Sequence, residues 1–103
     1  MIVAHALLRI RDGDEAAFEQ AMRAALPLIA GAAGYRGFEL RPAMEASGFY
    51  LVRVLWDDIA SHRDGFRRSP RYAEVMALIG PFIEQPPEVS YFGASVIDSQ
   101  LRA

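Results

Sequence analysis

The chain has 103 residues, of which 52% are hydrophobic, and it carries 11 basic and 13 acidic side chains, a formal net charge of −2 and no cysteine. This length and apolar content fit one domain with one core, and the dispersed, nearly balanced charge argues against nucleic acid or membrane lipid as a partner. The lack of cysteine excludes disulfides, thiolate nucleophiles and zinc–thiolate sites. With only His5 and His62 as imidazole ligands, we expect no metal site. The first residues form neither a signal peptide nor a membrane span, so we expect a cytoplasmic protein.

The first half of the chain predicts a strand, a helix and two further strands. Residues 2–10 predict a strand because both alternating faces are mainly apolar. Turn and N-cap residues at 12–15 then predict a helix. The expected buried stripe of this helix, at steps of three and four, is Phe18, Met22, Ala25, Leu26 and Ile29. Residues 35–41 predict the second strand, and residues 49–56 give the strongest strand signal in the chain.

The second half predicts a helix in two pieces and a last strand. Residues 59–66 have helical spacing, and Ser69-Pro70 interrupts the pattern. A second helical run then places its apolar side chains on one stripe, namely Tyr72, Val75, Met76, Ile79 and Phe82. Residues 88–97 predict the last strand, so we assign one domain to residues 1–97 and a C-terminal tail to residues 98–103. The order βαββαβ predicts an α+β, ferredoxin-like fold with an antiparallel four-stranded sheet.

The third predicted strand indicates a partner chain. Its two alternating faces are both apolar, with Arg53 the only charged residue, for which Glu39 and Glu88 are the candidate ion-pair partners. Two helices can cover only one face of a four-stranded sheet, so the apolar residues on the other face need another chain. We therefore expect a homodimer.

The residues able to do chemistry gather where the third strand ends. His62 is the only side chain on its helical face that titrates near neutral pH, and a partly desolvated imidazole there can act as a general base. Trp56 offers an indole face to a flat ligand and an N–H that needs a partner. In the structural alternative, His62 caps a helix or lies at the surface and Trp56 is a core residue. Tyr50 and Tyr72 can each direct a hydroxyl into the space between helix and sheet, or simply pack there with the hydroxyl in water.

Four arginines also recur at helical spacing in this part of the chain: Arg63, Arg67, Arg68 and Arg71. They could attract an acidic substrate, but neighbouring aspartates neutralise much of their charge. A solvated charged face is the favoured interpretation.

The order of several short segments resembles the antibiotic biosynthesis monooxygenase family of dimeric α/β-barrel proteins. These segments are residues 13–19, residues 34–41, Trp56 followed by residues 62–67 and 69–72, and Pro81-Phe82, and the resemblance covers residues 2 to about 96. In this family two ferredoxin-like subunits join their sheets into a barrel, and each keeps a pocket between its own sheet and helices. Characterised relatives oxidise aromatic polyketide phenols or hydroquinones to quinones with O2, without metal or flavin. The resemblance implies a small aromatic substrate, O2, no cofactor and a homodimer.

The resemblance also implies a pocket. In polyketide-oxidising members it is similar to one built from a strand asparagine, a strand-end tryptophan, a helix tyrosine and a later helix arginine. An ungapped alignment puts Val52, Trp56, His62 and Met76 at these positions. We expect His62 to be the catalytic residue that takes a phenolic proton, and the substrate to lie against Trp56, Val52, Phe66, Tyr72 and Met76.

Two other functions stay open. The loss of two polar pocket groups favours a non-catalytic dimeric protein that binds a small aromatic ligand. The haem-degrading branch of the superfamily needs a helix histidine and a strand asparagine, and Met76 and Ala6 occupy those places. A thioether can ligate haem iron, but without the asparagine this is the less favoured alternative.

Overall fold

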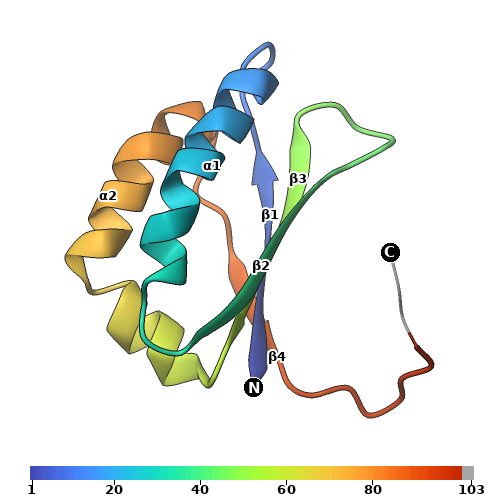
Figure 1. Cartoon of the computed structure of the whole chain (residues 1–103). Helices are drawn as coiled ribbons and strands as arrows, with labels where there is room; N and C mark the ends of the chain where they lie inside the picture. The colour runs from blue at the N-terminus through green and yellow to red at the C-terminus, as the bar shows by residue number, and fades with distance from the viewer. Residues whose placement is uncertain (101–103) are drawn as a thin grey trace.

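The computed structural model describes residues 1–100 as one sheet with its helices packed on one side (Figure 1). In chain order the elements are β1 (Ile2–Arg9), α1 (Glu15–Ala30), β2 (Tyr35–Pro42), β3 (Phe49–Trp56), the π-helical turn η1 (Ser61–Phe66), α2 (Pro70–Ile79), the short 3-10 helix η2 (Gly80–Phe82) and β4 (Val89–Phe92). The predicted element order is confirmed, and β3 has the predicted bounds.

The sheet has the order β2-β3-β1-β4, and every neighbouring pair is antiparallel. β3 therefore lies between β1 and β2, the two strands that α1 connects, which is the split βαβ arrangement of a ferredoxin-like fold. This confirms the predicted α+β class. Both central strands, β1 and β3, are eight residues long and pair over their full length.

The core lies between the sheet and the two main helices. The inner faces of β1 and β3 are buried, as is the stripe of α1 at Phe18, Met22, Ala25 and Ile29, whereas Leu26 is only half-buried. Trp56 and Phe18 are among the fully buried side chains. Their burial follows from the alternation of the strands and the three-to-four spacing of the helix.

The predicted last strand at residues 88–97 is wrong in length, because β4 ends at Phe92. Phe92 pairs with Val3 in the antiparallel register, so a continuing strand would run out of partners after only one more residue of β1, Ile2. Residues 93–100 form no helix or strand. Of the predicted tail at residues 98–103, the last three residues lie outside the part of the chain that the structure describes.

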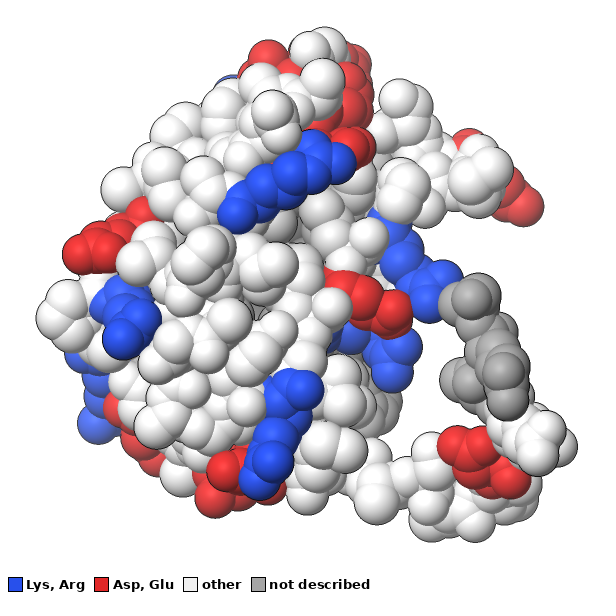
Figure 2. All heavy atoms as spheres, in the orientation of Figure 1, with Lys and Arg blue, Asp and Glu red and all other residues white. Residues whose placement is uncertain are grey.

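Both main helices pack on one face of the sheet, and no helix covers the other face (Figure 1). This uncovered face carries exposed apolar side chains. Leu7 on β1 is 63% exposed and Phe92 on β4 is 53% exposed. Arg53 pairs there with Glu39, the first of its two predicted partners. On the molecular face of Figure 2, basic and acidic side chains are interspersed, and neither sign forms a large patch. No helix within residues 1–100 is both long and apolar enough to span a membrane.

Candidate functional site

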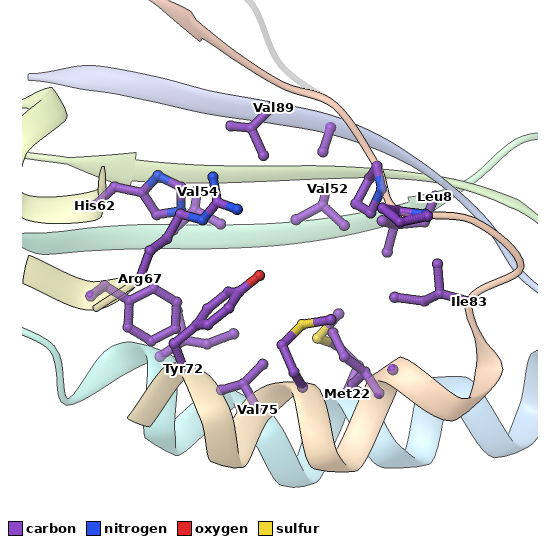
Figure 3. A pocket seen from close by; sticks show the side chains of 18 of the residues that line it. Leu8, Met22, Val52, Val54, His62, Arg67, Tyr72, Val75, Ile83 and Val89 are labelled. Atoms are coloured by element: carbon purple, nitrogen blue, oxygen red, sulfur yellow. The ribbon is translucent and has the colours of Figure 1, made fainter. Parts of the chain in front are cut away.

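A cavity of about 330 Å³ lies between the sheet and the helices (Figure 3). Its size is at the small end of the range of ligand pockets in proteins. All six predicted site residues line it, although they come from three separate elements: Val52, Trp56, His62, Phe66, Tyr72 and Met76. The structure thus brings the predicted set together around one space, while the roles assigned to these residues stay predictions.

Of the two tyrosines considered, only Tyr72 faces this cavity, with its hydroxyl pointing inward (Figure 3). The hydroxyl of Tyr50 instead donates a hydrogen bond to Glu19 Oε2 at 2.6 Å. Burial and the nearby carboxylate raise the pKa of Tyr50 to about 12. Tyr50 therefore belongs to the packing of α1 on β3.

The turn that carries His62 starts directly after β3. Asp58 accepts hydrogen bonds from both the backbone N–H and the hydroxyl of Ser61, each at 2.8 Å, and these bonds lower the pKa of Asp58. Gly34 makes room for this turn, since a Cβ there would lie 2.4 Å from Ser61 Oγ, and its φ of +86° also favours glycine. The end of β3 and the start of η1 are therefore held together by specific local contacts.

The π-helical hydrogen bond in η1 changes which residues face the cavity. The N–H of Arg67 donates a hydrogen bond to the carbonyl of His62 at 2.9 Å. This bond joins residues five positions apart, whereas an α-helical bond joins residues four apart. In an α-helix, residue 67 would be rotated by about 140° from residue 62. In the π turn His62, Phe66 and Arg67 all line the cavity.

His62 is the buried polar residue of the site, with 8% of its surface exposed. Its Nδ1 lies 2.7 Å from the hydroxyl of Tyr91, and its ring packs against Trp56 at a centroid distance of 5.4 Å. Burial, and secondarily the positive charge of Arg67, lower the pKa of His62 to about 4. The imidazole is therefore neutral at neutral pH, with Nε2 free of hydrogen-bond partners within residues 1–100.

Trp56 contributes an unused hydrogen-bond donor to the same wall. The residue is fully buried, and its Nε1–H has no partner within residues 1–100. A buried N–H without a partner costs about 1–3 kcal/mol. Because this N–H has no accessible surface, a ligand in the cavity reaches it only if neighbouring side chains move. Phe66 packs on the indole at 5.5 Å and holds the ring in place.

Arg67 and Tyr91 are site residues outside the predicted set, although Arg67 was named among the four arginines that could attract an acidic substrate. Tyr91 could have been noted, because strand alternation puts it on the same face as Val89, which lines the cavity. Arg67 gave no such signal, because the α-helical spacing assumed for residues 59–66 turns it away from His62. Arg67 is exposed, as expected for a solvated charged face, but it also lines the cavity.

No group of three or more potential metal-ligating histidine, aspartate or glutamate side chains occurs within residues 1–100. Met76 and Ala6, at the positions that a haem-degrading relative would need, both line the cavity. They supply a thioether and a methyl group where that branch requires an imidazole and an amide.

Comparison with known proteins agrees with the fold. The family model described as antibiotic biosynthesis monooxygenase matches residues 1–78. The chain belongs to this family. The uncharacterised protein YczJ of Bacillus subtilis (strain 168) is 39% identical over 92 residues, which cover 89% of this chain and 97% of YczJ.

Solved structures of the antibiotic biosynthesis monooxygenase family share this fold. A family member from Bordetella bronchiseptica superposes with a TM-score of 0.89 at 30% identity, covering 92% of this chain and 97% of that chain. SnoaB, a cofactor-independent oxygenase from Streptomyces nogalater, has a TM-score of 0.79 at 14% identity, covering 93% and 94% of the two chains. SnoaB shows a shared fold only, whereas membership of the family supports a monooxygenase function for this chain.

Proposed function

We propose that this protein is a cofactor-independent monooxygenase that oxidises a small aromatic phenol or hydroquinone with O2. The observation that carries the proposal is His62: a neutral, buried imidazole at the wall of an apolar cavity, oriented by Tyr91. A base in such a site can take a phenolic proton, and the phenolate is then the electron donor for oxygen.

The proposed reaction needs no external reductant. His62 Nε2 takes the phenolic proton while its Nδ1–H donates to the Tyr91 hydroxyl. The phenolate passes one electron to O2, and the resulting radical pair joins at a ring carbon that bears hydrogen. The O–O bond of this peroxide then breaks, the carbon loses its hydrogen as a proton, and one oxygen leaves as water. A phenol and O2 thus give a quinone and water.

The surroundings of His62 favour such a reaction. The cavity wall consists mainly of apolar side chains, including Val52, Phe66 and Met76, which exclude water from reactive oxygen intermediates. Tyr72 supplies a second hydroxyl that points into the same space.

We also propose that the protein is a homodimer that joins the uncovered faces of two sheets. Leu7 and Phe92 expose apolar surface there, beside side chains of β1 and β3 that are only half-buried. Burying such surface against a second copy is favourable by roughly 25 cal/mol per Å².

One observation favours binding without turnover as the second candidate. An ordinary phenol has a pKa near 10, so proton transfer to an imidazole with a pKa of about 4 is uphill in the empty site. If the site is catalytic, a bound substrate must bring the pKa values of the phenol and of His62 closer together.

Oxygen uptake separates the two candidates. Purified protein is mixed with 1,4-dihydroxynaphthalene or anthrone, and O2 consumption is compared with that in buffer. We expect faster uptake with wild type and a loss of roughly ten- to a hundredfold in His62→Gln, the lower part of the usual effect of losing a general base. His5→Gln, on the opposite face of the sheet, is the matched control.

Uptake that is equal in wild type and His62→Gln would remove His62 from the mechanism. Thermal protection and quenching of Trp56 fluorescence without any O2 uptake would establish the binding protein instead. A spectral shift on titration with haem would favour the haem branch.

A further inference from the structure

We propose that the natural ligand is an aromatic carboxylate, whose anionic group is bound by Arg67 at the mouth of the cavity while its ring enters between His62 and Tyr72. The inference deepens the proposed function, on which it rests for the reacting hydroxyl. It assigns a substrate class and a specificity residue to the site.

The positive and negative charges of the side chains around the cavity do not cancel. Among residues 1–100, only two charged side chains line it, Arg67 and Glu84. Glu84 is already neutralised, since its Oε2 lies 2.8 Å from Arg9 Nε. Arg67 has no carboxylate within 4 Å among the described residues, so the cavity presents one uncompensated positive charge to a ligand.

The three neighbouring arginines are engaged elsewhere. Arg63 and Arg68 both reach Asp64, at 3.4 Å and 4.0 Å. Arg71 extends toward the end of α1, where its Nη1 lies 3.5 Å from the carbonyl oxygen of Leu28. None of these three lines the cavity. The anion-binding role therefore falls on Arg67 alone.

The orientation of Arg67 has a structural cause. The π-helical turn brings it to the side of His62, and its guanidinium carbon lies 5.6 Å from the centroid of the Tyr72 ring. Figure 3 shows the guanidinium beside the imidazole of His62, and its charge is strong enough there to affect the pKa of His62. A guanidinium stacked on an aromatic ring is partly ordered before a ligand arrives.

The remaining polar groups indicate how the ligand lies. Beyond Arg67 and the ion-paired Glu84, the polar side chains that line the cavity are those of Tyr72, His62 and Gln85. Between these groups the wall is apolar and suits a flat ring. A hydroxyaryl carboxylate with one or two rings satisfies this pattern, with its carboxylate on Arg67 and its hydroxyl at His62.

Such a ligand also removes the smaller of the two causes that lower the pKa of His62, of which burial is the larger. The positive charge of Arg67 disfavours protonation of His62. A bound carboxylate compensates this charge and so favours the imidazolium that forms when the substrate hydroxyl loses its proton.

Calorimetric titration with matched acid and amide probes tests the inference. The first pair is 1-hydroxy-2-naphthoate and 1-hydroxy-2-naphthamide, and the second, smaller pair is salicylate and salicylamide. We expect at least one acid to bind wild type about tenfold or more tightly than its amide, as for hydrogen bonds to charged groups. Arg67→Gln should abolish this preference, and Arg67→Lys should retain part of it.

Arg68→Gln is the matched control, because it removes the same charge from the same segment but not from the cavity. Its preference for the acid should equal that of wild type. Equal affinities for acid and amide in wild type, a preference that survives in Arg67→Gln, or no binding of either pair would overturn the inference.

This test is independent of turnover. If O2 uptake depends on His62 but the acids bind no more tightly than the amides, the proposed function is supported and the inference about the carboxylate is rejected. If the Arg67-dependent preference is found without O2 uptake, the proposed ligand class is supported and the proposed oxygenase function is rejected.

Discussion

The imidazole Nδ1 of His62 lies 2.7 Å from the hydroxyl oxygen of Tyr91 and connects the turn η1 to the edge strand β4. The two rings also meet edge to face at a centroid distance of 5.6 Å. Because β4 is only four residues long, this hydrogen bond is a main contact between the strand and the turn. The orientation of the proposed catalytic imidazole thus depends on a residue 29 positions away in the sequence.

Replacing Tyr91 with phenylalanine should expose this dependence. Tyr91→Phe removes the partner of Nδ1, so the imidazole can rotate and change tautomer. We expect kcat for O2 uptake to fall by about tenfold, while the dissociation constant of an inert aromatic ligand changes less than twofold. The unpartnered Nδ1 should also cost about 1 kcal/mol of stability in urea unfolding.

Tyr35→Phe is the control for this change. Tyr35 packs edge to face on Trp56, but its hydroxyl has no hydrogen bond within residues 1–100. A loss of stability in Tyr91→Phe with an unchanged kcat would mean that Tyr91 is structural only.

The pKa of His62 predicts how stability depends on pH. It is about 4 in the folded protein and near 6.5 in the unfolded chain, so the unfolded state binds more protons between these values. Stability from this group is therefore present above pH 6.5 and is lost as pH falls through 4. Between pH 7 and pH 4.5 the loss should be about 2 kcal/mol larger in wild type than in His62→Gln, measured by urea unfolding. Equal losses of stability in wild type and His62→Gln would contradict the lowered pKa of His62.

Gly34 should be essential for the junction between β3 and η1. Gly34→Ala combines a positive φ with a clash against Ser61, so we expect a loss of about 2–4 kcal/mol in unfolding free energy. Gly13→Ala is the matched control, because Gly13 has nearly the same φ of +87° and nothing within 4 Å of an added Cβ. It should cost only about 1 kcal/mol. Equal effects would show that the contact with Ser61 is not important.

The proposed dimer makes a prediction about the uncovered face of the sheet. Leu7→Glu places a charge at its centre and should shift sedimentation from dimer to monomer. Met44→Glu changes a side chain that is 94% exposed in the loop between β2 and β3, and should leave the dimer intact. A wild-type monomer at micromolar concentration would contradict the dimer itself.

Much of the fold could be predicted from local patterns. The run of apolar and β-branched residues from Phe49 to Trp56 predicted β3 residue for residue, because such a run between turn signals is typical of a strand. The three-to-four spacing from Phe18 to Ile29 likewise predicted the buried stripe of α1, with Leu26 the one residue less buried than expected. The cavity residues could be grouped because they lie on the inner sides of the same elements.

What the sequence by itself determined is therefore the order of the elements, the side of each that faces the core, and six of the side chains that line the cavity. The length of β4 was decided by tertiary structure, because it depends on where its partner β1 begins. The position of Arg67 at the cavity depends on one hydrogen bond between residues five positions apart, and the hydrophobic periodicity of the sequence does not predict such a bond. The contact of His62 with Tyr91, and the burial that lowers the pKa of His62, arise only when η1 and β4 meet. Local periodicity reports which face of an element is buried, whereas hydrogen bonds and desolvation depend on distances between elements that only the folded chain sets.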